Sequence, residues 1–375
     1  MQPDKQKKSL SRQILQSVSD AVLIPFLAIL TAVFIGGLII KAVGGDPFVA
    51  YKALLQGAFG SKKALSETAI WSTPYIFAGL AVALAFRGGL FNIGAEGQLA
   101  LGAVFSALIG YALPEWFGFD LPKFIHLPLA ILAGALAGGL WAAIVGALKA
   151  YTGGHEVINT IMMNYIALNM TSFLVGGVMK DRNPLNVISR TPLIAESARI
   201  SPIFEGLRIH WGFVLALGMA FAIWWLLNKT TLGFEIRTVG LSPDAAKYAG
   251  INVKRIIIIT MLFSGILAGL AGSVEVTGLN YRHELGFSSG YGYDAIAIAL
   301  LGKSHPLGVV LASFLFSAMR SGATRMQFMT QLPVDLISMI QALILLFVAA
   351  DAIVRYIYRI KAKSERVVLT RGWGG

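Results

Sequence analysis

The sequence predicts an all-α polytopic membrane protein, and three observations support that fold class. Of the 375 residues 56% are hydrophobic and only 13% are charged, whereas soluble domains carry roughly 25% charged residues. Uncharged runs close to the length of a membrane-spanning helix, about 20 residues, recur along the whole chain. Lys and Arg gather at the tails and between these runs, as they do in cytoplasmic loops. The net charge of +12 therefore reflects orientation in a membrane and not a nucleic-acid partner.

The first uncharged run, residues 21–40, follows a basic N-terminal tail. It is longer than the core of a signal peptide, so we expect it to stay attached as the first transmembrane helix. Six further runs are clear. Three near the C-terminus are harder to delimit, because the first of them is short and contains Asp294. In order, the runs after the first are residues 68–86, 98–113, 127–148, 157–179, 211–228, 256–274, 290–302, 306–319 and 333–350.

The charges of the connecting segments predict an even number of spans. Residues 229–255 hold five Lys or Arg and the tail after Asp351 holds six, so both are expected on the cytoplasmic side together with the N-terminal tail. Counting residues 290–302 as a span makes ten and places both termini in the cytoplasm. The predicted outer loop, residues 180–210, also holds five basic residues, but longer loops follow the charge rule less strictly.

Ten spans form two inverted groups of four helices, the second to fifth and the seventh to tenth. A Gly-rich segment interrupts each group after its first helix, at residues 88–97 and again at residues 278–292. Backbone polar groups are not left unsatisfied in lipid, so such segments are expected against protein or a water-filled cavity. Paired breaks of this kind indicate a substrate pathway near the membrane midplane.

Polar side chains in and near the breaks are the candidates for that pathway. Glu96 and Asp294 are ionisable groups in or near the membrane and are functional candidates for that reason. Their structural alternative is a helix cap or an ion pair, for example between Glu96 and Arg87. Asn residues recur at helix-face spacing on the fifth span, where they serve either a neutral polar substrate or contacts between helices. The predicted pathway residues are Asn92, Glu96, Gln98, Asn159, Asn164, Tyr165, Asn169, Tyr281 and Asp294.

Small residues predict where two spans pack closely. Gly134 and Gly138 lie four residues apart on one span, and Gly265 and Gly269 do so on another. Such spacing lets helix backbones approach each other and carries no further function here.

A short cytoplasmic helix is predicted between the sixth and seventh spans. Ser242 caps its start, Pro243 suits its first position and Gly250 suits its end. Two interpretations stay open: its alanine face docks into a groove on a cytosolic partner, or the helix is a connector on the bilayer surface. The residues assigned to this segment are Gly240, Ser242, Pro243, Asp244, Ala245, Ala246, Ala249 and Gly250.

Three segments together resemble a known family. FNIGAEGQ at 91–98, the segment 240–250 and GYDAIAIALLG at 292–302 are similar to the permeases of ABC importers for branched-chain amino acids, simple sugars and nucleosides. Within that family, HEVINTIMMNY at 155–165 is similar to the purine-nucleoside branch. The resemblance implies the ten-helix, type II architecture of cobalamin importers, with residues 241–249 as the coupling helix.

The resemblance also implies the organisation and partners of the chain. Residues 1–375 would form a single permease domain in the bacterial cell membrane. Expected partners are a second, different permease, a cytosolic ABC ATPase and an extracellular substrate-binding lipoprotein. The chain itself would be no enzyme and hold no cofactor or metal, because ATP and Mg would bind the partner ATPase. Its parts would be residues 20–228 (first half), 229–255 (coupling segment), 256–350 (second half) and 351–375 (basic tail).

Other functions have weaker support. Permeation of simple sugars or branched-chain amino acids stays open within the family, and an autonomous proton- or sodium-coupled carrier would give Glu96 and Asp294 coupling-ion roles. AIALLGKS at 297–304 has apolar residues where a phosphate-binding loop needs flexible backbone. GFSSG at 286–290 matches the nucleophile-elbow pattern, but a hydrolase at Ser288 or Ser289 also needs a partnered base. The absence of Cys excludes disulfides and thiolate metal sites.

Overall fold

The computed structural model describes residues 3–119, 121–182, 188–288, 290–333 and 335–359. Regular structure in these residues is helical, apart from two isolated bridges that join Arg190 to Glu284 and Pro202 to His210. The predicted all-α class is therefore confirmed. The basic C-terminal tail beyond residue 359 lies outside the described residues.

The chain divides into two compact units, Met1–Gly57 together with Gly322–Gly375, and Ala58–Ser321. In the first unit α1 (Pro3–Ala42) packs against α13 (Asp335–Ala349). A Cβ on Gly36 of α1 would lie 2.6 Å from Ile340 Cγ1, so the two helices approach closely at this glycine. The first unit also holds α14 (Asp351–Ile357), most of α2 (Pro47–Phe59) and the end of α12 (Pro306–Thr330).

The second unit holds most of the helices and both predicted breaks. In chain order they are α3 (Lys62–Arg87), α4 (Ala95–Phe117), α5 (Lys123–Thr152), α6 (Glu156–Gly176), the 3₁₀ turn η1 (Glu196–Ala198), α7 (Trp211–Lys229), α8 (Thr231–Leu241), α9 (Pro243–Tyr248), α10 (Val253–Glu275), the π-helix η2 (Val276–Asn280), α11 (Tyr291–Leu301) and most of α12.

Eight helices of the described chain are long and apolar enough to cross a membrane. They are α3 to α7, α12, the part of α1 from Leu23 to Ala42, and α10 continued through η2 to Asn280. Two shorter apolar helices, Tyr291–Leu301 and Asp335–Val348, coincide with the predicted spans at 290–302 and 333–350. The chain is thus a multi-pass membrane protein.

The predicted end of the span at 306–319 is wrong, because α12 continues through Arg320 to Thr330. The uncharged run that predicted this span stops at Arg320, and a charge in lipid is costly. In the structure that charge is paired with Asp294 inside the protein, so the helix is not interrupted.

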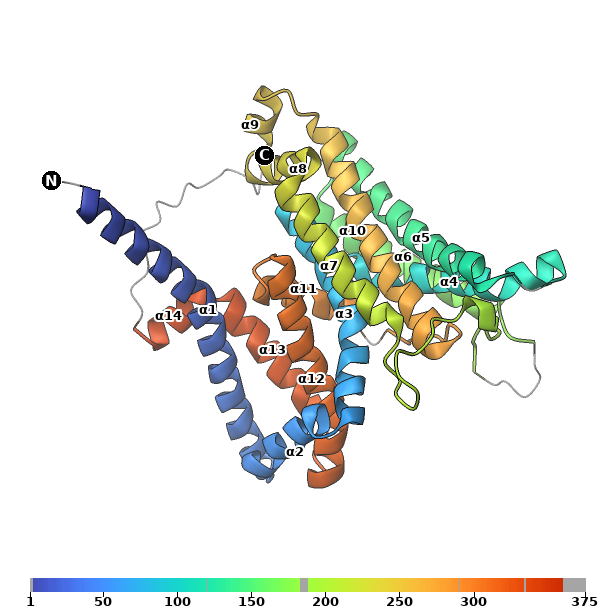
Figure 1. Ribbon diagram of the computed structural model, residues 1–375, viewed down its shortest axis with the longest axis horizontal. Coiled ribbons are helices and arrows are strands. Elements are labelled where there is room, and N and C mark those ends of the chain that lie inside the picture. Colours follow the sequence, from blue (N-terminus) through green and yellow to red (C-terminus); the bar gives the residue numbers. More distant parts are fainter. Residues whose placement is uncertain (1–2, 120, 183–187, 289, 334, 360–375) are drawn as a thin grey trace. The chain divides into compact units, whose positions relative to one another are not determined.

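Three helices form the centre of the second unit, where α10 packs against both α5 and α4 (Figure 1). Glycines make this possible: a Cβ on Gly102 of α4 would lie 2.5 Å from Gly269 Cα, and one on Gly138 would lie 2.5 Å from the Gly265 carbonyl oxygen. The predicted role of the paired glycines in close helix packing is confirmed.

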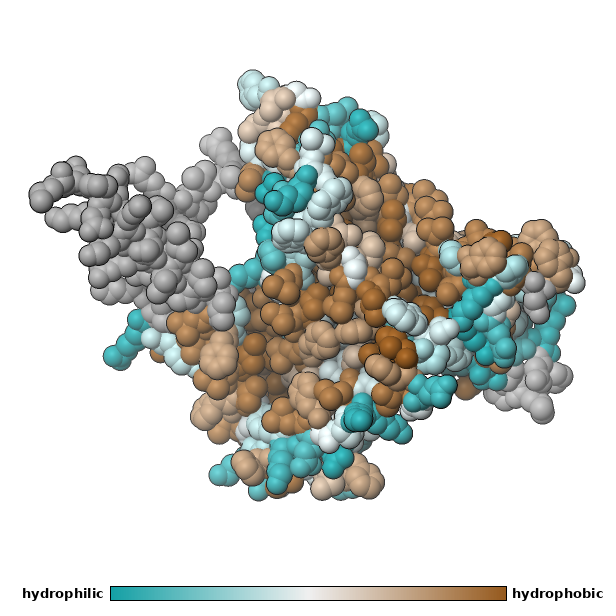
Figure 2. All heavy atoms as spheres, viewed as in Figure 1, coloured by the Kyte–Doolittle hydropathy of each residue, from teal (hydrophilic) through white to brown (hydrophobic). Residues whose placement is uncertain are grey.

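The surface has the pattern of a membrane protein. Figure 2 shows hydrophobic side chains along α7 and α10 and hydrophilic ones near α8. Phe221 and Trp225 of α7 are exposed although they are large and apolar, as expected of side chains that face lipid.

Two ends of the second unit can be distinguished by their contacts. The ring of Tyr151 at the end of α5 lies 5.1 Å from Lys254 Nζ at the start of α10. The guanidinium of Arg87 at the end of α3 donates to the Ser304 carbonyl at 3.0 Å. We call this side, with α8 and α9, the α9 end. The opposite end carries residues 118–119, 121–122, 177–182, 188–210 and 276–284.

Candidate functional site: two helix breaks that meet at half depth

The N-termini of α4 and α11 meet inside the second unit. A Cβ on Gly292 would overlap the backbone nitrogen of Glu96, so only glycine fits at this contact. Gly302, which ends α11, adjoins the Lys303 and Ser304 carbonyls bound by Arg87 at the α9 end. With 11 residues at 1.5 Å each, α11 starts about 16 Å from that end, which is about half of a 30 Å hydrocarbon core.

Glu96 joins the two helices at this point. Its carboxylate accepts hydrogen bonds from the Gly292 backbone N–H at 2.6 Å and from the Ser288 hydroxyl. A negative charge here offsets the positive ends of two helix dipoles. The alternative of an ion pair between Glu96 and Arg87 is wrong, because Arg87 binds the carbonyls of residues 303 and 304 instead. Ser288 donates to Glu96 and not to a histidine, and Ser289 lies outside the described residues.

The first break, residues 88–94, is held by buried amide side chains. Asn92 donates to Gln98 Oε1 at 2.9 Å and accepts from Gln98 Nε2 at 3.0 Å. The Asn92 amide also donates to the Ser264 hydroxyl of α10 at 2.8 Å. All three side chains are at most 1% exposed. The break is therefore tied to both α4 and α10.

Asn164 of α6 completes this network from the other side. Its Oδ1 accepts from the Gly97 N–H and its Nδ2 donates to the Ile93 carbonyl, both at 2.8 Å. Three buried polar residues in the first half of α6, Glu156, Thr160 and Asn164, lie four positions apart, so they share one helix face.

The other polar residues predicted on α6 do not join the network. Asn159 is half-buried, and Tyr165 and Asn169 are exposed. The Asn169 amide donates to the Tyr165 carbonyl of its own helix at 2.8 Å. Of the four predicted α6 residues, the structure brings only Asn164 to the first break.

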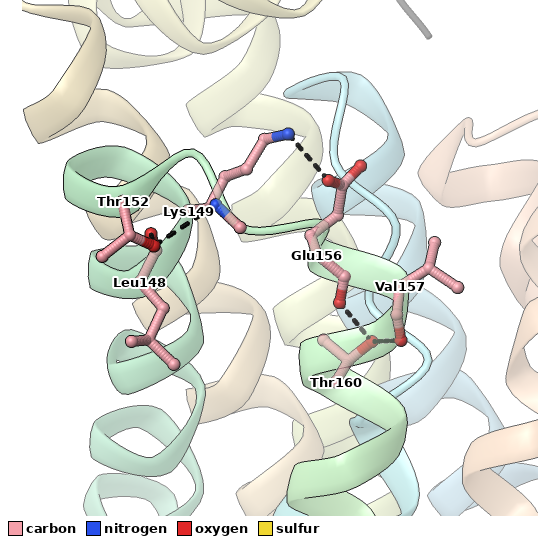
Figure 3. Close-up of polar contacts among 7 residues, drawn as sticks. Leu148, Lys149, Thr152, Glu156, Val157 and Thr160 are labelled. Carbon is pink, nitrogen blue, oxygen red and sulfur yellow. Dashed lines mark hydrogen bonds and ion pairs between the residues drawn. The ribbon is translucent and has the colours of Figure 1, made fainter. Parts of the chain in front are cut away.

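The start of α6 is fixed at the α9 end. Figure 3 shows Lys149 of α5 reaching Glu156, with 3.0 Å between Lys149 Nζ and Glu156 Oε2. Thr160 donates to the Glu156 carbonyl at 2.8 Å, one turn before Asn164. This arrangement orients the polar face of α6 toward the first break.

The described part of the second break, residues 281–288 and 290, is held largely through its backbone. The Ile194 N–H donates to the Tyr281 carbonyl at 2.8 Å, and the Thr191 N–H donates to the His283 carbonyl at 3.0 Å. The break starts after the π-helix η2, a distortion that often marks functional sites. Tyr281 has a left-handed backbone, with φ of 55°, and its ring lies 4.9 Å from the Arg199 guanidinium. It belongs to the opposite end and not to the meeting point of the helices.

His283 is the unusual residue of the second break. Its side chain is 2% exposed, and neither ring nitrogen has a hydrogen-bond partner among the described residues. The ring of Phe287 packs edge-on against it with 4.7 Å between centroids. Burial lowers the pKa of His283 to about 3, so its imidazole is neutral at physiological pH.

Asp294 belongs to a second cluster, on the other side of α11. Tyr75 donates its hydroxyl hydrogen to Asp294 Oδ2 at 2.7 Å, and Arg320 Nη1 lies 3.7 Å from the same oxygen. The Arg320 guanidinium carbon lies 4.8 Å from the ring centroid of Trp71 and 5.0 Å from that of Tyr291. A cation enclosed by ring faces in this way is stabilised by cation–π attraction.

Sequence reasoning missed Arg320, Tyr75 and Ser264. The charge of Arg320 was a usable signal, because an ionisable residue within a continuous apolar helix is a functional candidate. Tyr75 and Ser264 carried no such signal. They are single polar residues in long apolar helices, and only the packing of α3, α10 and α11 reveals their partners.

The short helix α9 lies where it was predicted. The Ser242 hydroxyl accepts from the Ala245 N–H at 3.3 Å, Pro243 is the first helical residue, and Gly250 has φ of +80°. Ala246, however, is fully buried while Ala245 and Ala249 are exposed. The expected alanine docking face is therefore incomplete, because Ala246 packs inward.

The exposed surface at α9 also includes large side chains and not only alanines. The Tyr248 side chain is 94% exposed and Leu241, just before the helix, is 78% exposed. Gly240 of α8 lies against the first break, because a Cβ on Gly89 would lie 2.9 Å from Gly240 Cα. The α8–α9 segment thus contacts the break directly.

Comparisons with known proteins bear on the whole chain. The family described as branched-chain amino acid transport system / permease component matches residues 64–349. The guanosine ABC transporter permease protein NupP of Bacillus subtilis (strain 168) is 43% identical over 344 residues, 90% of this chain and 95% of that protein. The nucleoside ABC transporter permease protein NupB of Lactococcus lactis subsp. cremoris (strain MG1363) is 35% identical, covering 89% of this chain and 92% of that protein.

A relative named for another substrate is also similar. The glucose ABC transporter permease protein TsgB13 of Haloferax volcanii is 33% identical, covering 91% of this chain and 90% of that protein. No solved structure matches the chain at a significant level.

Proposed function

Because the chain belongs to the family of branched-chain amino acid transport system permease components, we propose that it is the membrane-spanning subunit of a bacterial ABC importer for nucleosides. The observation that carries this proposal is the 43% identity to a guanosine permease over 90% of the chain. The glucose relative at 33% identity makes a simple-sugar substrate the second candidate.

The meeting point of α4 and α11 is the proposed centre of the pathway. Discontinuous helices whose N-termini lie near the midplane are the usual construction of substrate sites in transporters. Nucleosides are neutral, which matches a meeting point whose amides and hydroxyl, those of Asn92, Asn164 and Ser288, are bonded within the protein and hold the shape of the site. In this proposal Glu96 and Asp294 have structural roles: Glu96 binds the Gly292 N–H, and Asp294 pairs with Arg320.

Energy for transport comes, in this proposal, from a partner ATPase that binds ATP and Mg. Its contact surface on this chain is α9 with the exposed Tyr248. A movement of α9 passes through α8 to the first break, because Gly240 lies against Gly89. A substrate-binding lipoprotein would deliver the nucleoside at the opposite end, and a second permease would complete the membrane part.

We infer the orientation from the same segment. The α9 end is cytoplasmic, since residues 229–255 are basic and an ATPase acts from the cytosol. Counting α11 and α13 with the eight longer spans gives ten crossings, both termini inside, and the type II architecture with two inverted groups of helices. The division into residues 20–228, 229–255, 256–350 and 351–375 follows from this topology.

Uptake in sealed vesicles tests the proposal. The assembled transporter should import radiolabelled guanosine only when ATP is available to the ATPase, and excess unlabelled adenosine should compete while excess glucose should not. Collapsing the proton and sodium gradients should leave the rate unchanged. Uptake that follows an ion gradient without ATP would instead support the autonomous carrier, and competition by glucose alone would support the sugar permease.

A further inference from the structure

Helix α6 is the least buried of the long apolar helices although its sequence is the least hydrophobic of them. Of the eight long spans it has the lowest mean hydropathy and the smallest buried share, 22%. Its exposed face includes Tyr165 at 61% exposure and also Asn169. Apolar side chains such as Ile158, Met162 and Ile166 share this exposure, but polar residues in membrane helices usually face protein or a water-filled space.

Tyr165 lies at the depth of the helix breaks. It follows His155, the N-cap of α6 at the α9 end, by ten residues, which places it about 15 Å into the membrane. Tyrosine normally concentrates at membrane surfaces, where its hydroxyl meets water. In hydrocarbon the hydroxyl of Tyr165 would lose that hydration without a compensating bond.

Tyr293 is the second exposed tyrosine at this depth. It lies in the first turn of α11 beside Gly292, and its side chain is 47% exposed. Its neighbour Gly292 lies against the backbone nitrogen of Glu96. Asn164, the neighbour of Tyr165, accepts from the N–H of the next residue, Gly97. Two partly exposed tyrosines, one from α6 and one from α11, therefore adjoin residues that contact the first turn of α4.

The chemistry of the two rings selects one part of the substrate. A nucleobase is flat and aromatic, and bases stack on aromatic side chains whatever their identity. A sugar offers no such face, so it gains less from the same rings. Asn164 is already bonded to Gly97 and Ile93, which fixes the α6 backbone next to Tyr165.

We propose that Tyr165 and Tyr293 form a stacking site for the nucleobase in the pathway and thereby favour nucleosides over sugars. This inference rests on the proposed function, because it needs a nucleoside as substrate. It assigns the exposed position of Tyr165 on α6 to the pathway and not to lipid.

Conservative pairs of variants test the stacking site in the complete transporter. Tyr165→Phe and Tyr293→Phe keep the ring, whereas Tyr165→Leu and Tyr293→Leu remove it. We expect the Leu variants to lower guanosine uptake about tenfold, and the Phe variants to stay within about twofold of the native rate, in line with the contribution of base–aromatic stacking. Phe173→Leu is the matched control, because Phe173 is an aromatic residue of the same helix with 70% exposure.

The outcomes separate this inference from the proposed function. If both Leu variants take up guanosine at the native rate, or if Phe173→Leu lowers uptake as much as they do, the stacking site is overturned. The proposed nucleoside permease is unaffected by that result. Absence of guanosine uptake by the native transporter overturns both. If a Leu variant inserts poorly, single cysteines at positions 165 and 293 provide a second test. Guanosine should slow their reaction with a thiol reagent, and a lack of this protection counts against the stacking site.

Discussion

The two helix breaks differ in how they are held. In the first, residues 88–94, the polar side chain of Asn92 is fully buried and bonded to Gln98 and Ser264. In the second, residues 281–290, His283 is buried without a partner among the described residues. Glu284 there makes only longer ion pairs, at 3.8 Å to Arg190 and 3.6 Å to Arg282.

This difference indicates separate roles for the breaks. A segment whose buried groups are all bonded opens only at high cost, because each bond broken in the interior leaves an unsatisfied polar group. The second break is held by its backbone, by partly exposed ion pairs and by one buried side-chain hydrogen bond, from Ser288 to Glu96, so fewer buried polar bonds oppose its opening. We propose that the first break keeps its internal hydrogen bonds during transport and moves only as a unit with α8, whereas the second break opens.

The largest expected effect comes from removing one polar side chain from each break. Asn92→Ala leaves Gln98 and Ser264 without their partner and should lower the free energy of unfolding by about 2–3 kcal/mol. Glu284→Ala should cost at most about 1 kcal/mol, because its ion pairs are partly exposed. Thermal unfolding of the purified variants in detergent measures both, and equal losses would remove the distinction between the breaks.

A smaller effect concerns pH and the second break alone. The pKa of His283 is lowered to about 3 by burial, whereas an unfolded histidine titrates near 6.5. The open segment therefore binds a proton more readily than the closed one, so the stability of the break is complete above pH 6.5 and falls below it. The loss is about 1.4 kcal/mol per pH unit, or about 2 kcal/mol at pH 5.

Hydrogen exchange, corrected for the intrinsic effect of pH, measures this loss. Amides of residues 281–284 should lose protection between pH 7 and pH 5, while those of residues 90–98 should not. His283→Phe is the control: it keeps a ring against Phe287, removes the titrating group and should abolish the difference. His210 also has a lowered pKa, about 4, so a pH effect that persists in His283→Phe would point to His210 instead.

Much of the fold was predictable because membrane helices depend on local composition. Eight long apolar helices coincide with predicted spans, and the capped helix α9 follows from Ser242, Pro243 and Gly250. The end of α12 was not predictable by the same reasoning. Its Arg320 is stabilised by Asp294, by Tyr75 and by the rings of Trp71 and Tyr291, and these partners lie on other helices.

The candidate site was predictable in composition but not in arrangement. Asn92, Gln98, Glu96 and Asn164 do converge, because the Gly-rich break places backbone groups inside the protein and polar side chains must satisfy them. Which face of α6 turns inward could not be read from the spacing, since Asn159, Asn164 and Asn169 are five residues apart and point in different directions. Likewise, an alanine-rich α9 did not indicate that Ala246 is the residue that packs inward.

Cysteine accessibility tests the central claim, that the second break opens during transport while the first stays closed. The native chain has no Cys, so single cysteines at Ser264 and Ser288 report on the first and second break. Both native side chains are at least 90% buried and should react slowly with a membrane-impermeant thiol reagent at rest. With substrate and ATP cycling, Ser288→Cys should react about tenfold faster or more, as its buried site becomes populated in an open state, while Ser264→Cys stays unreactive. Equal acceleration at both positions, or reaction at Ser264→Cys alone, would contradict the account.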